Sequence, residues 1–114
     1  MTTSHSCWTL ICPLTDIAPN TGVAAIVGKA QVAVFRVRQG GTDKLFAIGN
    51  QDPFTGSNVL SRGIIGDKDG RLKVASPLLK QTFDLATGVC LEKPEVSVPV
   101  YAVRVVDGKV EVGG

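Results

Sequence analysis

The sequence of 114 residues predicts an all-β protein, and three observations lead to this class. Short apolar runs rich in β-branched residues recur along the chain, separated by turns rich in Gly, Pro, Asn and Asp. No apolar pattern with the period of a helix continues for several turns. The Asp107-Gly108 pair supplies the residues that a tight type I′ hairpin turn requires, because both central positions need positive φ. A sandwich or small barrel of short antiparallel strands is therefore expected.

The first half of the chain contains four apolar runs that are expected to form strands. They cover residues 8–12, 23–27, 32–37 and 45–48, and Pro13 ends the first of them. A hairpin turn is expected at 28–29, and residues 39–43 form a flexible turn before the fourth run. Along the third run the side chains alternate between two faces, with Ala33, Phe35 and Val37 on one and Val32, Val34, Arg36 and Arg38 on the other.

The second half contains an irregular segment followed by two hairpins. Residues 50–61 are rich in Asn, Asp, Gly, Ser and Pro, and a loop of about 12 residues inside a compact domain is usually functional or inherited from something functional. Residues 63–66 and 72–75 flank a turn at 67–70, and a second proline-containing loop starts at Ser76. Around the last turn, Val105 faces Val110 and Val103 faces Val112, which places four valines on one side of the hairpin.

Length and composition limit the domain organisation and exclude several classes of protein. A chain of 114 residues can build one core, so residues 1–114 are expected to form a single domain with a flexible tail at 1–6. The net charge of +2 implies no nucleic-acid partner, and no apolar run reaches the ~18 residues of a membrane span. The N-terminus lacks the features of a signal peptide, which predicts a cytoplasmic protein with Cys7, Cys12 and Cys90 as free thiols.

Catalytic residues and a metal site are not expected, because His5 is the only histidine. Ser–His–Asp and Cys–His mechanisms would both have to use this residue, and no nucleophile stands out. His5, Cys7 and Cys12 together offer three donors, whereas a structural zinc site takes four. The sequence has no glycine-rich nucleotide loop, and its arginines and lysines are expected to form an ordinary solvated surface.

Two loops and the turn that follows them resemble the cluster-binding half of a Rieske iron–sulfur domain. They read NQDPF at 50–54, SPLLK at 76–80 and FDLATG at 83–88. Rieske domains have Cys-Pro-His in the first loop and Cys-Pro-x-His-Gly in the second. By this resemblance, Asp52 and Phe54 stand at the first Cys and His positions, and Ser76 and Leu79 stand at the second pair. A Rieske centre needs two cysteines and two histidines, which this chain cannot supply.

The same loops are similar, more closely, to the small subunits of bacterial assimilatory NAD(P)H-dependent nitrite reductases. The motifs are NxDPF at 50–54, VLSRG at 59–63 and VASPLxKQ at 74–81, which include that family's own replacements at the ligand positions. The resemblance implies a Rieske-like β-sandwich with neither an iron–sulfur cluster nor any other cofactor of its own. It also implies a large catalytic subunit that carries FAD, an iron–sulfur cluster and sirohaem. That partner reduces nitrite to ammonium in the cytoplasm, as part of nitrate assimilation.

A subunit of this kind would be non-catalytic and would act by docking on the large subunit. The surface expected to make the contact comprises Asp52, Phe54, Arg62, Leu79 and Lys80, because exposed apolar side chains at loop tips often mark contact surfaces. Phe54 and Leu79 could instead pack on each other. The alternative function is that of a free-standing, cluster-free β-sandwich that binds another protein, whereas the single histidine excludes a Rieske ferredoxin.

Overall fold

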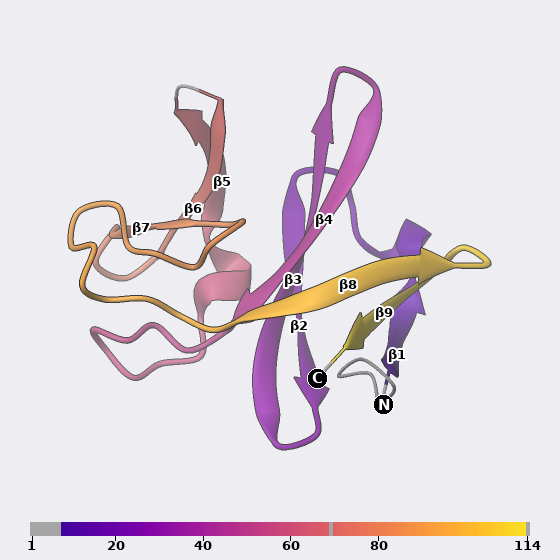
Figure 1. The fold of residues 1–114 in the computed structure, drawn as a ribbon, viewed down its shortest axis with the longest axis horizontal. Helices are drawn as coiled ribbons and strands as arrows, with labels where there is room; N and C mark the ends of the chain where they lie inside the picture. Colours follow the sequence, from indigo (N-terminus) through magenta and orange to yellow (C-terminus); the bar gives the residue numbers. More distant parts are fainter. Residues whose placement is uncertain (1–7, 69, 114) are drawn as a thin grey trace, which may run out of the picture.

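The structure, a computed structural model, describes residues 8–68 and 70–113, and strands dominate this part of the chain (Figure 1). Six strands form a larger sheet and three form a smaller one. The strands are β1 (Trp8–Pro13), β2 (Thr21–Val27), β3 (Ala30–Gln39), β4 (Thr42–Gly49), β5 (Ile64–Lys68), β6 (Arg71–Ala75), β7 (Thr82–Asp84), β8 (Val100–Val106) and β9 (Lys109–Gly113). Two short 3-10 turns, η1 (Leu14–Asp16) and η2 (Leu60–Arg62), accompany them. The expected all-β class is confirmed.

The larger sheet has the order β1-β9-β8-β4-β3-β2, and all its neighbouring strands pair antiparallel. β2 and β3 pair around the turn expected at 28–29. β8 and β9 pair around Asp107 and Gly108, whose φ angles are 53° and 76°. The register joins Val105 to Val110, as the turn type predicts. The C-terminal hairpin inferred from the sequence is therefore confirmed in both turn and register.

β3 contributes to two cores because both of its faces are covered. Ala33, Phe35 and Val37 belong to one core, which residues of the smaller sheet and of the loops complete. Val32 and Val34 belong to the other, together with buried side chains of β2, β4 and β9. This division agrees with the alternation of the two faces predicted from the sequence.

The structure differs from the expectation at two places. The flexible turn predicted at 39–43 is reduced to Gly40 and Gly41, both with positive φ, and the strands continue to either side of them. β7 was not expected, because three residues are too few to show an alternating pattern. All three of its residues are buried, so tertiary packing rather than local preference makes this strand.

The smaller sheet has the order β5-β6-β7 and lies away from the β1–β9 end of the larger sheet (Figure 1). The irregular segment after β4 and the loop between β6 and β7 lie on this same side of the molecule (Figure 1). No helix within residues 8–68 and 70–113 is long and apolar enough to cross a bilayer. The tail expected at 1–6 lies outside the described residues.

Candidate functional site

The first loop starts at Asn50, a buried residue that fixes both ends of the loop. The N–H of Asn50 donates to the carbonyl of Gln31 in β3 at 3.0 Å. Its side-chain oxygen accepts from the N–H of Ser61 at 2.8 Å, and its carbonyl accepts from the N–H of Leu60 at 3.1 Å. Leu60 and Ser61 begin η2, so this one residue connects the end of β4 to the 3-10 turn that closes the loop.

Asp52 organises the turn inside this loop. Its N–H donates to the carbonyl of Ser57, and its own carbonyl accepts from the N–H of Gly56, both at 2.8 Å. The carboxylate oxygen Oδ1 accepts from the N–H of Phe54 at 2.8 Å, the local bond that makes Asp favourable in turns. Asp52 is 0 % exposed, so its second oxygen, Oδ2, needs a donor from elsewhere in the protein.

Ser76 supplies that donor from the second loop. Its hydroxyl donates to Asp52 Oδ2 at 2.5 Å, and the residue is 1 % exposed. The main chain closes the second loop around Ser76, whose N–H donates to the carbonyl of Gln81 (2.8 Å) and whose carbonyl accepts from the N–H of Lys80 (3.1 Å). Loops separated along the chain are thus joined by a short, buried hydrogen bond to a carboxylate, one of the stronger types in proteins.

The structure joins the residues at the two cysteine positions by a hydrogen bond, and it gives the residues at the two histidine positions different degrees of burial. Phe54 is half-buried at the border of the core that contains Phe35, and its ring centroid lies 6.3 Å from that of Phe83 with the planes at 42°. Leu79, by contrast, is 54 % exposed. Phe54 therefore serves packing, while Leu79 belongs to the surface.

The structure changes the set of residues expected to contact a partner. Asp52 is wholly buried, so its expected place on the surface is wrong: both of its oxygens accept hydrogen bonds within the protein. Arg62, Leu79 and Lys80 are exposed. Leu78, which is 48 % exposed, was missed. The signal for it was present in the sequence, as two adjacent leucines in a proline-containing loop.

The residues at the four ligand positions do not fit a [2Fe–2S] cluster. Phe54 and Leu79 have no donor atom, and the oxygens of Asp52 and Ser76 are already engaged with each other. Within residues 8–68 and 70–113, no group of three or more His, Cys, Asp or Glu side chains could hold a metal ion.

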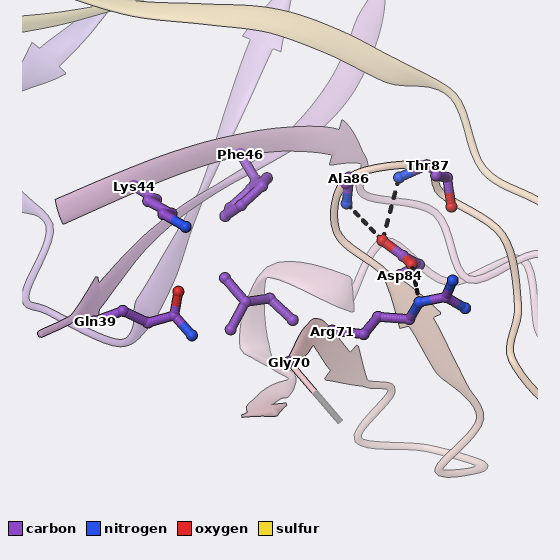
Figure 2. Close-up of a pocket in the computed structure, with 9 residues that line it drawn as sticks. Gln39, Lys44, Phe46, Gly70, Arg71, Asp84, Ala86 and Thr87 are labelled. Atoms are coloured by element: carbon purple, nitrogen blue, oxygen red, sulfur yellow. Dashed lines mark hydrogen bonds and ion pairs between the residues drawn. The ribbon is translucent and has the colours of Figure 1, made fainter. Parts of the chain in front are cut away.

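The FDLATG turn forms one wall of a hollow of about 650 Å³ (Figure 2). Asp84 Oδ1 accepts from the N–H groups of Ala86 (2.8 Å) and Thr87 (3.3 Å), and Asp84 Oδ2 pairs with Arg71 Nε at 2.9 Å. Lys44 also lines the hollow (Figure 2), but its described lining contains no histidine, cysteine or second carboxylate. The carboxylate is thus engaged within the turn, and no acid–base pair faces the hollow.

Two arginines of β3 form ion pairs with one aspartate of β4. Arg36 Nη2 and Arg38 Nε pair with Asp43 at 2.7 Å and 2.9 Å. The pKa of Asp43 is lowered to about 2, first by the hydrogen bond from Arg38 and then by that from Arg36. Arg36 also donates to the carbonyl of Ile17 at 2.8 Å, which attaches the connection between β1 and β2 to β3.

The described cysteines do not have the properties of nucleophiles. Burial, and then the charge of Asp16, raise the pKa of the Cys12 thiol, whereas an activated thiol has a lowered pKa. Cys90 is wholly buried. His5 and Cys7, which the sequence placed beside Cys12 as candidate donors, lie outside the described residues.

Comparison with known proteins supports the Rieske resemblance. Residues 7–113 match the family model of the Rieske-like [2Fe-2S] domain. The ferredoxin of carbazole 1,9a-dioxygenase from Nocardioides aromaticivorans is a structural neighbour, with a TM-score of 0.76 and 25% identity over 95% of this chain and 98% of the ferredoxin. Fold and site together define a Rieske-like domain whose residues at the ligand positions do not fit the cluster.

Relatives of higher sequence identity show to which family of Rieske-like domains the chain belongs. A nitrite reductase (NADH) small subunit from Escherichia coli (strain K12) is 50% identical over 107 residues, which cover 94% of this chain and 97% of the relative. The NMR structure of the E. coli protein NirD has a TM-score of 0.86 and 50% identity, over 95% of this chain and 96% of NirD. The chain belongs to the family of nitrite reductase small subunits.

A further relative contains a similar segment within a longer chain. The nitrite reductase [NAD(P)H] large subunit of Klebsiella oxytoca is 40% identical over 106 residues. The match covers 93% of this chain but 11% of the large subunit. In that protein, a counterpart of nearly this whole chain is covalently part of the large subunit.

Proposed function

We propose that this chain is the non-catalytic small subunit of an NADH-dependent nitrite reductase and docks on a separate large catalytic subunit. The observation that carries the proposal is the Klebsiella large subunit, which includes a segment similar to this chain. Covalent linkage keeps two domains at high effective concentration. A domain that is separate in one protein and fused in another is therefore expected to work in contact with the same partner. Residues 1–114 then act as one Rieske-like unit.

The reduction of nitrite to ammonium is assigned to the large subunit, which would carry FAD, an iron–sulfur cluster and sirohaem. This chain would carry no cofactor. The donor chemistry at Asp52, Phe54, Ser76 and Leu79 supports this division, because cofactors provide the electron transfer that ordinary side chains cannot. We propose that this reaction belongs to nitrate assimilation and takes place in the cytoplasm, as the resemblance to the family implies.

The proposed contact is the loop-tip surface, defined by Arg62, Leu78, Leu79 and Lys80. Two adjacent leucines, each about half exposed, lie in the second loop. Covering apolar surface stabilises an association by about 25 cal/mol per Å², so these side chains can contribute to docking. Asp52 and Phe54 support the loops from within the protein.

The contact is tested by mixing the purified chain with the large subunit and measuring co-elution by size-exclusion chromatography. Leu79→Asp is expected to weaken the complex about tenfold or more, because a charge replaces a covered apolar side chain. Leu10→Asp is the matched control, since Leu10 is 57 % exposed on β1, away from both loops (Figure 1).

Unchanged co-elution of the Leu79→Asp variant would place the contact elsewhere on the chain. If the unsubstituted chain does not associate with the large subunit at all, the proposed function is wrong. The alternative, a free-standing β-sandwich that binds a different protein, would then be favoured.

A further inference from the structure

We infer that the hydrogen bond between Asp52 and Ser76 is a tie that sets the spacing of the two loops for docking. It takes the mechanical role of the cluster, whose ligands come from the corresponding two loops in Rieske domains. Because both residues are buried, they act as positioning residues and do not touch the partner themselves. The docking part of this inference rests on the proposed function.

The tie is the direct link between the loops. Among the described residues, it is the one hydrogen bond that joins residues 50–62 to residues 76–81. The strands that follow and precede these loops, β5 and β6, pair only from Ile64 and Ala75 onward. Beyond that point, the packing of Phe54 on Phe83 brings the loops near each other, and the 2.5 Å bond from Ser76 Oγ to Asp52 Oδ2 joins them directly.

Each end of the tie is fixed within its own loop, so the bond positions whole turns and not only two side chains. Asp52 is held by main-chain bonds to Ser57 and Gly56. Ser76 is held by main-chain bonds to Gln81 and Lys80. A change in the distance between Asp52 and Ser76 would therefore displace residues 53–56 relative to residues 77–80.

The same hydroxyl reaches the surface leucines. While Ser76 Oγ donates to Asp52, it also accepts from the N–H of Leu78 at 3.4 Å. The carbonyl of Ser76 accepts from the N–H of Lys80, the residue directly after Leu79. The exposed pair Leu78 and Leu79 is thus held between two bonds to the residue that makes the tie.

A second bond of the same chemistry provides a matched control. The hydroxyl of Thr82 donates to Glu92 Oε2, also at 2.5 Å, and joins β7 to the segment after Cys90. Thr82 makes no described bond to residues 50–62 or to Leu78 and Leu79. Glu92 is exposed whereas Asp52 is buried, so the free energy of unfolding of each variant is measured beside its binding. A role limited to stability predicts that binding is retained wherever the chain remains folded, whereas a role in docking predicts that only the loss of the Asp52–Ser76 bond weakens binding.

The test compares Ser76→Ala with Thr82→Val. Affinity for the large subunit is measured by titration calorimetry, and amide hydrogen exchange is measured on the free chain. Ser76→Ala is expected to weaken binding about tenfold, the consequence of one lost hydrogen bond to a charged group. It should also accelerate exchange at the amides of 54–56 and 78–80 more than elsewhere. Thr82→Val is expected to bind as the unsubstituted chain does.

A covalent replacement shows whether the spacing itself matters. In the double variant Asp52→Cys and Ser76→Cys, oxidised glutathione closes a disulfide, detected by the loss of two hydrogens in the mass. The oxidised form, in which the loops are linked, is expected to bind about tenfold more tightly than the reduced form, which has no link between them.

Undiminished binding and unchanged loop exchange in Ser76→Ala would overturn the inference, as would equal binding by the oxidised and reduced forms. The two proposals fail in different ways. If the unsubstituted chain does not bind the large subunit, the proposed function fails with the docking role. The loop exchange of the free chain would still decide whether the tie sets the spacing.

Discussion

Within the two loops, some side chains stabilise the fold and others are exposed at the surface. Phe54 and Leu79 occupy equivalent places in the resemblance to Rieske loops, yet one packs on Phe83 and the other is exposed. Asp52 and Ser76 also occupy equivalent places, but these two residues meet in one buried hydrogen bond although they lie far apart in the sequence. The burial and the hydrogen bonds of these four residues therefore follow from tertiary contacts and not from their motif.

Alanine substitutions distinguish a side chain that packs in the fold from one that is exposed. Phe54→Ala is expected to lower the free energy of unfolding by about 1–3 kcal/mol, somewhat less than for a fully buried Phe, because it removes the ring that packs on Phe83. Leu79→Ala is expected to change that free energy by no more than about 0.5 kcal/mol. Urea unfolding followed by circular dichroism measures both. Equal losses would contradict the different burial of the two side chains.

Asp43 gives a prediction for the dependence of stability on pH. Its pKa in the folded protein is about 2, below the ordinary value, because Arg38 and Arg36 donate to it. A lowered folded pKa contributes stability that is present above the unfolded pKa, near 4, and is lost as the pH falls toward 2. The stability of the unsubstituted chain should therefore decline more steeply between pH 4 and pH 2 than that of Asp43→Asn. Parallel declines in the two proteins would show that this carboxylate does not contribute.

At the scale of elements, the loops depend on how closely η2 approaches β6. Gly63 follows η2, and a Cβ at this position would overlap the carbonyl oxygen of Ala75 and lie 2.6 Å from Val74 Cγ2. The φ of Gly63 is −73°, so the need for glycine here comes from the close approach and not from backbone strain. The small residue allows the first loop to return beside the strand that leads to Ser76.

Gly63→Ala is expected to destabilise the protein by about 1–3 kcal/mol, because neither the carbonyl of Ala75 nor the buried Val74 can move away cheaply. Gly66→Ala is the matched control in β5, the strand that follows Gly63, since its Cβ would meet only the flexible side chain of Lys73, at 3.4 Å. Thermal unfolding of both variants measures the difference. A Gly66→Ala variant as unstable as Gly63→Ala would rule out the close approach as the cause.

Elements with local signals could be predicted from the sequence. The Asp107-Gly108 turn fixed both a hairpin and its register, and the two faces of β3 followed from simple alternation. β7 could not be predicted, because its three residues form a strand only through burial. The site was partly predictable: the motif selected Asp52 and Ser76 as a related pair. Their direct bond and the burial of Asp52 depend on long-range packing that no local pattern encodes.

At the scale of the whole molecule, the chain has a Rieske-like fold in which residues at the ligand positions contribute to folding. Two cores share β3, and the loops that would hold a cluster are held by Asp52, Ser76 and Phe54. Leu78 and Leu79 of the second loop remain about half exposed. Such a molecule is suited to support a catalytic subunit rather than to transfer electrons through a cluster of its own.

The most direct measurement is nitrite-dependent oxidation of NADH by the purified large subunit, recorded with and without this chain, with size-exclusion chromatography of the mixture. An accessory subunit predicts co-elution together with a marked gain in the rate or in the lifetime of the enzyme. If the mixture shows no complex and the rate and lifetime do not change, the proposed role is contradicted.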